Sequence, residues 1–315
     1  MIVEREAIKI NENISIREAI KIMLRNELRE VIVVDDKDKY KGIVKLRDLI
    51  SEKNYREKIK KVKKKDCKVY EKDVVKIAKV MLQNDCYLAA YLDKDDKVLG
   101  CFHIDDLLEY VKEEFGNLKV EEVETKNPVI IEANEPIYRA IKLMALHNIS
   151  HIPIVKDRKL YGIVSSKDIS EFILKYTKER ASLGELIGKK FEIFKNPIES
   201  IATKEVITYS KNEKLSNIIK KMFYYKISCL VKEDLTGIVT KKDLIKPIIE
   251  EEREGIEAII VGKENVPSYY QSYLEEYVRR FISKAKKMFE KGFLKVVIEK
   301  HRDIYSIHLT FSDYK

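Results

Sequence analysis

The sequence predicts an α/β (α+β) protein made of four similar repeats, followed by a small β-α-β-β domain. Two features of the 315 residues support this fold class. A glycine-led motif recurs four times, each time after the same order of helix and strands. The last 64 residues lack this motif and combine a long helix with concentrated positive charge. Because internal repetition identifies the structural unit of a fold, the repeat predicts the architecture of most of the chain.

Each repeat ends in a Gly, a short apolar run and an Asp six positions after the Gly. The four motifs begin at Gly42, Gly100, Gly162 and Gly237, with spacings of 58, 62 and 75 residues. Four copies with one order and one terminal motif make coincidence improbable. We therefore expect repeats one to four at 1–54, 55–116, 117–178 and 179–251, and a basic domain at 252–315.

An amphipathic helix and two strands precede the end of each repeat. In repeat three, helical spacing of apolar residues predicts a helix over 137–146. Short apolar runs predict strands at 152–155 and 161–164, and a new helix begins near Asp168. Repeat one follows the same order over 16–44. Because a sheet of two or three strands cannot bury both faces alone, we expect the repeats to pack as two pairs.

Composition excludes several classes of protein. The apolar content of 45% and the absence of low-complexity tracts predict packed cores. No run of 18 apolar residues exists, so we expect no membrane-spanning helix, and the charged N-terminus is unlike a secretory signal. The four cysteines show no CxxC or zinc-type spacing, which indicates a reducing, cytoplasmic location and no metal site.

The Gly–Asp turn has the chemistry of a nucleotide site. The Gly allows close approach of backbone or ligand, and the Asp stands at a helix start, where phosphates are also attracted. A carboxylate there can accept two hydrogen bonds from the vicinal hydroxyls of a ribose. The alternative for each Asp is an ordinary helix N-cap.

The four copies resemble CBS domains, which pair into Bateman modules. The strongest match is repeat three, with Ile149–Val155 and Gly162–Asp168, followed by repeat four, and the resemblance covers about residues 1–250. It implies two Bateman modules in a disc. In this family the Ser or Thr three residues after the Gly and the Asp six residues after it often hold the ribose of an adenosine ligand. The matching residues are Ser165 and Asp168 in repeat three, and Thr240 and Asp243 in repeat four.

Repeats one and two keep the acid but change the third residue after the Gly. Asp48 and Asp106 are present, whereas Lys45 and His103 replace the hydroxyl residue. His151 lies where related domains often place a basic residue near phosphate. The resemblance therefore implies a regulatory ligand that is an adenine nucleotide (AMP, ADP or ATP) or S-adenosylmethionine, with no required cofactor.

The C-terminal domain reads as β-α-β-β. A strand at 256–261 precedes a long amphipathic helix that opens at Pro267 and ends at Gly292, and strands at 293–299 and 304–311 form a hairpin. The last strand alternates apolar residues onto one face, as a half-buried strand requires: Tyr305, Ile307, Leu309 and Phe311.

Positive charge is concentrated in this domain. The chain has a net charge of +9, and the stretch from Arg279 to Arg302 holds nine bases and two acids. On the helix, Arg280, Lys284, Lys287 and Lys291 share one face. A solvated face and a footprint for RNA or an acidic partner both remain open.

The domain resembles the start of the ribosome hibernation-promoting factor domain, whose order is β-α-β-β-β-α. The match rests on Ile-Ile-Val-Gly at 259–262, Asn265-Val266, the basic helix and Val-Val-Ile-Glu at 296–299, and extends over three strands and one helix. It implies contact with small-subunit rRNA. The candidate contacts are Arg279, Arg280, Lys284, Lys287 and Lys291.

Two functions of different classes follow. The first is a non-enzymatic regulator that binds an adenine nucleotide or adenosyl ligand through the repeats and engages the small ribosomal subunit through its C-terminal domain. The second is an energy-sensing regulatory subunit that acts on a protein partner such as a kinase. No nucleophile–base grouping, Walker loop or HExxH motif appears, so we do not expect an enzyme. A homo-oligomer is expected in either case.

Overall fold

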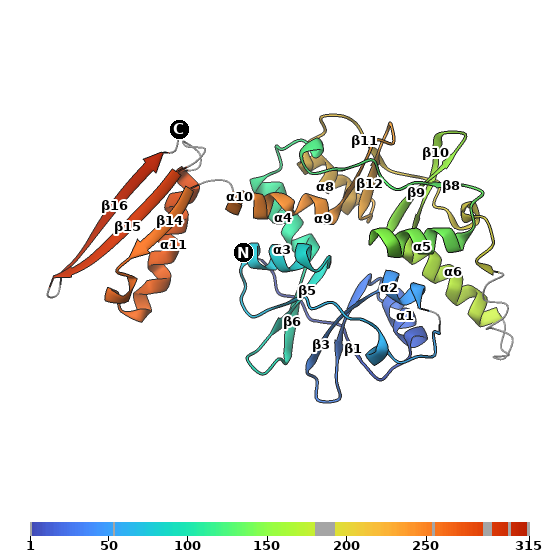
Figure 1. Ribbon diagram of the computed structural model, residues 1–315, viewed down its shortest axis with the longest axis horizontal. Coiled ribbons are helices and arrows are strands. Elements are labelled where there is room, and N and C mark those ends of the chain that lie inside the picture. Colours follow the sequence, from blue (N-terminus) through green and yellow to red (C-terminus); the bar gives the residue numbers. More distant parts are fainter. Residues whose placement is uncertain are drawn as a thin grey trace. The chain divides into compact units, whose positions relative to one another are not determined.

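The chain folds as two units, Met1–Pro247 and Ile248–Lys315. The computed structural model describes residues 2–52, 54–179, 193–253, 256–285, 292–301 and 304–313 (Figure 1). Among these residues, no helix is long and apolar enough to cross a bilayer.

Repeats one and two have the predicted order of helix, two strands and helix, with a short parallel strand added in front. The elements of repeat one are β1 (Lys9–Asn11), α1 (Ile16–Arg25), β2 (Glu30–Val34), β3 (Tyr40–Lys45) and α2 (Leu46–Ser51). Those of repeat two are β4 (Lys68–Val69), α3 (Val74–Gln83), β5 (Leu88–Leu92), β6 (Val98–His103) and α4 (Ile104–Glu114). In both sheets the middle strand pairs parallel with the first strand and antiparallel with the last.

Repeats three and four follow the same plan. Repeat three contains β7 (Thr125–Lys126), β8 (Ile131–Glu132), α5 (Ile137–His147), β9 (His151–Lys156), β10 (Lys159–Ser165) and α6 (Ser166–Glu179). Repeat four contains β11 (Thr208–Tyr209), α8 (Leu215–Tyr224), β12 (Cys229–Lys232), β13 (Gly237–Thr240) and α9 (Lys241–Leu244), and α10 (Lys246–Arg253) follows. Short 3-10 turns lie at Ile59–Lys61, Val120–Glu122 and Ile198–Ile201.

Local sequence explains why the helices begin and which face they bury. The hydroxyl of Ser15 accepts a hydrogen bond from the amide of Glu18 and so caps α1. The buried residues of α1 are Ile16, Ala19, Ile20 and Met23, at helical spacing. Polar residues cover the other side, so the helix has one face to pack against its sheet.

In each pair of neighbouring repeats, the segment that leads into one repeat forms backbone hydrogen bonds with the last strand of the other. The chain entering repeat two pairs with β3, where Ile43 and Lys65 exchange two hydrogen bonds of 2.8 Å. The chain entering repeat one pairs with β6, where Arg5 and Cys101 exchange two of 2.9 Å. Repeats three and four are joined in the same way, at Ile163 with Thr203 and at Ile238 with Thr125. The predicted pairing is confirmed.

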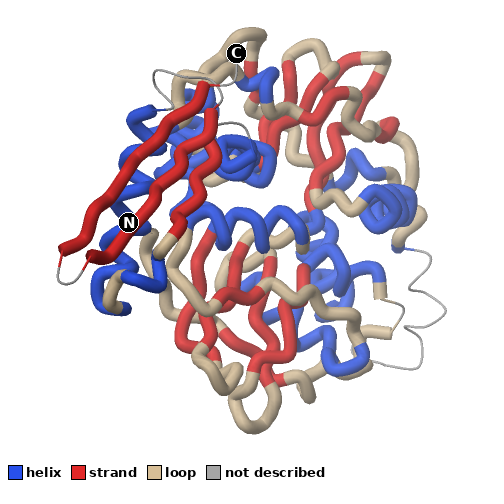
Figure 2. The backbone as a smooth tube through the Cα atoms, turned by 60° about the vertical axis from the view of Figure 1, so that its left-hand side comes forward, coloured by secondary structure: helices blue, strands red, loops and turns tan. Residues whose placement is uncertain are grey.

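Helices join the two pairs. α2 of repeat one packs against α5 and α6 of repeat three, and α4 of repeat two packs against α8 and α9 of repeat four. Ile50 of α2 is buried in the hydrophobic core of repeat three. Helices therefore separate the two groups of strands in this unit (Figure 2).

The motif glycine makes room for the entering segment. A Cβ atom on Gly42 would lie 2.6 Å from the Cβ of Lys64, and the φ angle of Gly42 is +128°. A Cβ atom on Gly162 would lie 2.9 Å from the carbonyl oxygen of Thr203. The expected close approach is thus made by the chain of the paired repeat.

The C-terminal unit has the predicted β-α-β-β order. It contains β14 (Ile256–Val261), a 3-10 turn (Lys263–Asn265), α11 (Ser268–Ala285), β15 (Gly292–His301) and β16 (Ile304–Asp313). β15 lies in the middle, parallel to β14 and antiparallel to β16. The predicted end of the helix at 286–291 lies outside the described residues. Of the alternating residues on β16, Phe311 packs against the core, whereas Tyr305, Ile307 and Leu309 are exposed, so the half-buried strand was predicted wrongly at these three positions.

Gly42→Ala is expected to lower the free energy of unfolding by about 1–3 kcal/mol, because the new Cβ overlaps Lys64 and the backbone angle is unfavourable for alanine. The change is measured by urea denaturation followed by circular dichroism. Lys37→Ala, at an exposed position in the turn between β2 and β3, is the control and should change stability by no more than about 0.5 kcal/mol. Equal effects of the two variants would contradict the steric account.

Candidate functional site

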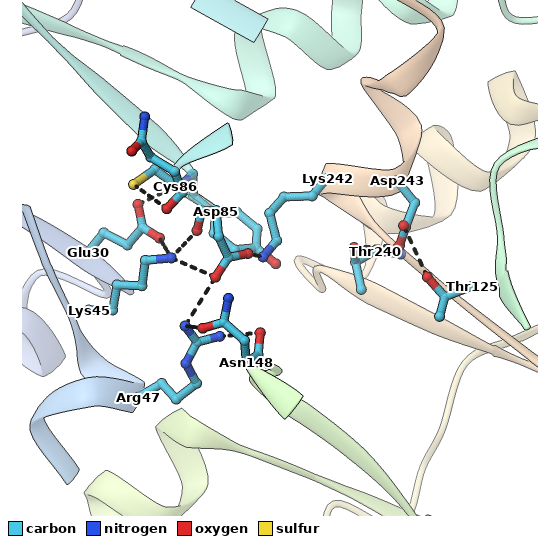
Figure 3. Close-up of polar contacts among 12 residues, drawn as sticks. Glu30, Lys45, Arg47, Asp85, Cys86, Thr125, Asn148, Thr240, Lys242 and Asp243 are labelled. Atoms are coloured by element: carbon cyan, nitrogen blue, oxygen red, sulfur yellow. Dashed lines mark hydrogen bonds and ion pairs between the residues drawn. The ribbon is translucent and has the colours of Figure 1, made fainter. Parts of the chain in front are cut away.

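A cluster of buried and half-buried polar side chains lies where the four repeats meet. It surrounds a small hollow, and all four repeats contribute to it. The lining residues, called the central cluster, are Arg29, Glu30, Lys45, Arg47, Asp85, Tyr87, Ser150, Ser166 and Lys242. Figure 3 shows Glu30, Lys45, Arg47, Asp85 and Lys242 converging from separate parts of the chain.

Two positions of the repeat supply most of this cluster. One is the start of the middle strand, represented by Glu30, the first residue of β2, and by Tyr87, just ahead of β5. The other is the turn between the last strand and the following helix, represented by Lys45, Ser166 and Lys242. Superposing the four repeats in sequence points to these two regions but not to the individual residues. Glu30 and Tyr87 lie 12 and 13 residues before the motif glycine, and Lys45, Ser166 and Lys242 lie three, four and five residues after it.

Lys45 joins repeats one and two through buried ion pairs. Its Nζ lies 2.8 Å from Oδ2 of Asp85 and 3.7 Å from Oε1 of Glu30. Glu30 also accepts hydrogen bonds from the amides of Tyr87 and Leu88, at 2.6 and 3.3 Å. Burial raises the pKa of Glu30, and Lys45 and the Tyr87 amide oppose that rise. The residue that replaces the expected hydroxyl in repeat one is therefore committed to these contacts.

Arg47 extends the network to repeat three. Its Nη1 donates to the carbonyl oxygen of Asn148, and its Nη2 donates to Oδ1 of Asn148, both at 2.6 Å. The same Nη2 donates to Asp85 at 3.0 Å. Asn148 ends α5 in the left-handed conformation, with φ of 58°. One buried guanidinium thus fixes three repeats relative to one another.

His151 is buried and lies between repeats one, three and four. Its Nε2 is 3.1 Å from Nη1 of Arg29 and 3.0 Å from the hydroxyl of Ser228. Burial, together with the Arg29 cation, holds the pKa of His151 well below its ordinary value of 6.5. Because Arg29 can only donate, Nε2 is the acceptor and the imidazole is neutral. It offers a phosphate no positive charge.

The central cluster is cationic and tightly packed. Arg29, Lys45, Arg47 and Lys242 oppose only two acids, Glu30 and Asp85, which leaves a formal charge of +2. Lys242 contacts Asp85, and burial, with the Lys45 cation nearby, lowers the pKa of Lys242 to about 8. The hollow is about the size of one water molecule.

In repeat three, Asp168 keeps one carboxylate oxygen open. Its Oδ2 accepts hydrogen bonds from the amide and the hydroxyl of Ser165, both at 2.7 Å. Its Oδ1 makes no hydrogen bond or ion pair within the described part of the chain. The pair therefore forms a helix cap that still presents an unused acceptor.

In repeat four, both oxygens of Asp243 are occupied. Oδ2 accepts from the amide and the hydroxyl of Thr240, at 2.8 and 2.6 Å. Oδ1 accepts from the Thr125 hydroxyl at 3.2 Å and from Nζ of Lys246 at 2.6 Å. Thr240 and Asp243 are brought together as expected, in a closed arrangement (Figure 3).

The acids of repeats one and two differ from each other. Arg5 forms a bidentate ion pair with Asp106: Nη2 donates to Oδ1 at 2.7 Å and Nε donates to Oδ2 at 3.0 Å. The backbone amide of His103 also donates to Oδ2 of Asp106. Among the described residues, the carboxylate of Asp48 contacts Arg47, whose Nε donates to Oδ1 at 3.3 Å. Three of the four acids cap their helices, whereas no side-chain cap bond is made at the start of α2.

The candidate RNA contacts are only partly visible. Arg280 is exposed on α11, and its Nη2 lies 2.6 Å from Glu276, one turn away. Arg279 and Lys284 lie on α11, but their side chains are outside the described part. Lys287 and Lys291 also lie outside the described residues.

Comparison with known proteins identifies the repeats. The family model described as CBS domain matches residues 2–54, 120–175 and 198–250, just over half of the chain. A crystal structure from Methanocaldococcus jannaschii, described as a candidate archaeal homolog of γ-AMPK, is 19% identical with a TM-score of 0.68. The alignment covers 78% of this chain and 97% of that one. The likeness shows a shared fold.

Two curated relatives match less than half of this chain. A homoserine O-acetyltransferase of Methanococcus vannielii is 37% identical over 134 residues, covering 42% of this chain and 24% of that protein. An L-aspartate semialdehyde sulfurtransferase of Methanocaldococcus jannaschii is 32% identical over 130 residues, covering 40% of this chain and 22% of that protein. The chain spans about a quarter of the length of these relatives.

The depressed pKa of His151 predicts a loss of stability in acid. Below about pH 6.5, His151 binds a proton in the unfolded chain but stays neutral in the folded chain. The free energy of unfolding therefore falls as pH falls, by up to about 1.4 kcal/mol per pH unit. His151→Gln should weaken this dependence, because glutamine has no such proton to bind. Urea denaturation at several pH values between 5 and 8 measures it.

His147→Gln, at the exposed end of α5, is the matched control and should keep the wild-type profile. If the free energy of unfolding of His151→Gln and of the wild type depended on pH in the same way, the protonation of His151 would not be the cause of the acid destabilisation.

Proposed function

Because this chain belongs to the CBS domain family, we propose that it is a non-enzymatic regulatory protein that binds an adenine nucleotide or adenosyl ligand in the repeat pair 117–178 and 179–251. The observation that carries this proposal is the open carboxylate oxygen of Asp168 beside the Ser165 hydroxyl. Ribose hydroxyls donate well to a carboxylate, and a hydrogen bond to a charged group contributes about 1.5–3 kcal/mol.

The contacts of the other three acids support Asp168 as the principal ribose site. Asp106 would have to release Arg5, and Asp243 would have to release Lys246, before either could accept from a ribose. At the third position after the Gly, Asp48 has Lys45 in place of a hydroxyl residue, and Lys45 is engaged with Glu30 and Asp85. Thr240, Asp243, Asp48 and Asp106 are therefore secondary sites in this proposal.

The central cluster is a suitable destination for the phosphate of such a ligand. Ser166, which lines the hollow, stands two residues before Asp168 on α6. The surplus of cations favours a phosphate over water there. Since the hollow has room for about one water molecule, a phosphate enters only if side chains such as Lys242 move. Ligand binding would then favour a different packing of the two pairs, which is the requirement for a regulatory response.

The similarity to enzymes does not extend this proposal to catalysis. Those relatives share no more than a quarter of their length with this chain, so their catalytic activities are not assigned to it. The solved relative described as a candidate homolog of γ-AMPK makes an energy-sensing subunit with a protein partner, such as a kinase, the alternative form of the same proposal.

Asp168→Asn should weaken binding of the tightest ligand about 10- to 100-fold, because an amide is a poorer acceptor than a carboxylate. Isothermal titration calorimetry with AMP, ADP, ATP and S-adenosylmethionine measures it. Asp106→Asn, whose carboxylate is already held by Arg5, is the control and should bind as the wild type does. No heat with any of the four ligands would reject the sensor function, and unchanged binding by Asp168→Asn would reject this site.

Engagement of small-subunit rRNA by the C-terminal domain stays a prediction. Binding to phosphates is salt dependent, so co-sedimentation with small ribosomal subunits should occur at low salt and be lost as salt rises. Arg280→Glu, an exposed position, should reduce it and lower the salt dependence by about one phosphate contact. Recovery of one stoichiometric protein from lysate, without ribosomal components, would favour the protein-partner alternative.

A further inference from the structure

The segment that leads into repeat two carries a dense positive charge. Residues 58–65 hold six lysines and no acid, and their other two members are Ile59 and Val62. Both apolar side chains are buried in the core of repeat one. Four of the lysines are exposed and two are half-buried: Lys58, Lys60, Lys61 and Lys63, then Lys64 and Lys65. We call residues 58–65 the basic segment.

The backbone of the basic segment is fixed on repeat one. Its first part is the 3-10 turn Ile59–Lys61. The amide of Lys60 donates to the carbonyl oxygen of Glu12 at 2.8 Å, and the backbones of Lys65 and Ile43 exchange two hydrogen bonds of 2.8 Å. A partner that binds here therefore meets lysines on an ordered backbone, which reduces the conformational entropy lost on binding.

Few acids neutralise the basic segment. Nζ of Lys61 lies 2.7 Å from Oε2 of Glu57. Nζ of Lys64 donates to two backbone carbonyl oxygens, and burial lowers the pKa of Lys64, which Glu12 opposes. Among the residues that the structure describes, the other four lysines form no ion pair: Lys58, Lys60, Lys63 and Lys65. Most of this positive charge is thus available to an anionic partner.

The equivalent segments of the same chain show that the fold does not require these lysines. The 3-10 turns Val120–Glu122 and Ile198–Ile201 lead into repeats three and four, and each segment likewise ends in backbone pairing beside a motif glycine. Residues 119–125 hold one lysine and three glutamates, and residues 197–203 hold one glutamate and no base. Since like charges repel, a run of lysines that the backbone does not need indicates a counter-charge from outside the chain.

We propose that the basic segment binds the phosphate backbone of a nucleic acid duplex, without regard to base sequence. From Lys58 to Lys65 the chain rises about 2 Å per residue over the 3-10 turn and about 3.3 Å per residue beyond it, roughly 20 Å in all. One strand of a duplex carries a phosphate about every 3.4 Å along the axis. The segment therefore spans about six phosphates and offers six lysines to them.

The composition of the basic segment favours a duplex backbone over other anionic partners. A protein interface depends on a few aromatic, apolar or arginine side chains that fill pockets, and a single strand stacks its bases on aromatic rings. Residues 58–65 contain no aromatic residue and no arginine, and Ile59 and Val62 are buried. Lysine offers a compact point charge, which suits a phosphate and carries no geometry for reading a base.

Fluorescence anisotropy of labelled, blunt-ended DNA and RNA duplexes with the full chain tests the proposal. The test variant is Lys58→Gln with Lys60→Gln and Lys63→Gln, which removes three exposed lysines that form no ion pair among the described residues. It should bind both duplexes about 10- to 100-fold more weakly at low salt. The slope of log affinity against log salt should become shallower by about three, one for each lysine.

A matched variant separates the location of the charge from its amount. Lys94→Gln with Lys211→Gln and Lys220→Gln removes three exposed lysines from other parts of the first unit and leaves the same net charge. It should bind as the wild type does. Circular dichroism melting curves verify that each variant is folded.

The candidate rRNA contacts on α11 are tested independently. Arg280→Glu, added to either triple variant, should leave the difference in affinity between the two unchanged, because distant sites act additively. Unchanged duplex binding by the test variant, or an equal loss in both triple variants, would overturn the proposal. Poly-glutamate that competes as well as a duplex of equal charge would assign the basic segment to an acidic protein instead, and would also overturn it.

Discussion

Buried ion pairs among Lys45, Glu30 and Asp85 join the first two repeats at the centre of the first unit. Arg47 and Lys242 carry the same network into repeats three and four. Removing one partner from such a network typically costs about 3–5 kcal/mol, because the remaining charge stays buried without compensation. A buried ion pair adds little net stability over well-packed apolar residues, but it discriminates strongly between packings. A shifted arrangement of the four repeats would leave a buried charge without its partner, so the network favours one arrangement.

The same network is where a regulatory ligand would act. Four cations and two acids surround the hollow, so the net charge of the cluster attracts an anion. The hollow has room for about one water molecule, so it is too small for a phosphate as it stands. In the proposed function, a phosphate therefore enters only if side chains of the cluster such as Lys242 move. His151 contributes to the packing and not to the charge, because burial keeps it neutral. Burial, with the Lys45 cation nearby, lowers the pKa of Lys242 in this cluster to about 8.

The C-terminal unit illustrates the opposite situation, in which a surface is left incomplete inside one chain. α11 covers β14 and β15, and Ile307 and Leu309 on β16 stay exposed although they lie on the core face.

The elements themselves could be predicted from sequence to within a few residues. The helix expected at 137–146 is α5, and the strand expected at 256–261 is β14, because periodicity, caps and glycines act over a few positions. The candidate ligand residues were predicted as one motif repeated four times, yet each acid has a different environment. Arg5 holds Asp106 across 101 positions of chain, Lys246 holds Asp243, and Asp168 alone keeps an open oxygen beside a hydroxyl.

The sequence by itself therefore determined the repeats, their order and the chemical groups at each turn. Tertiary structure decided that Lys45 is a buried ion-pair partner, that His151 is neutral, and that β16 extends past its helix. The physical reason is the range of the interactions. Backbone propensities depend on neighbours in sequence, whereas the charge state, pairing and coverage of a side chain depend on residues that only folding brings beside it.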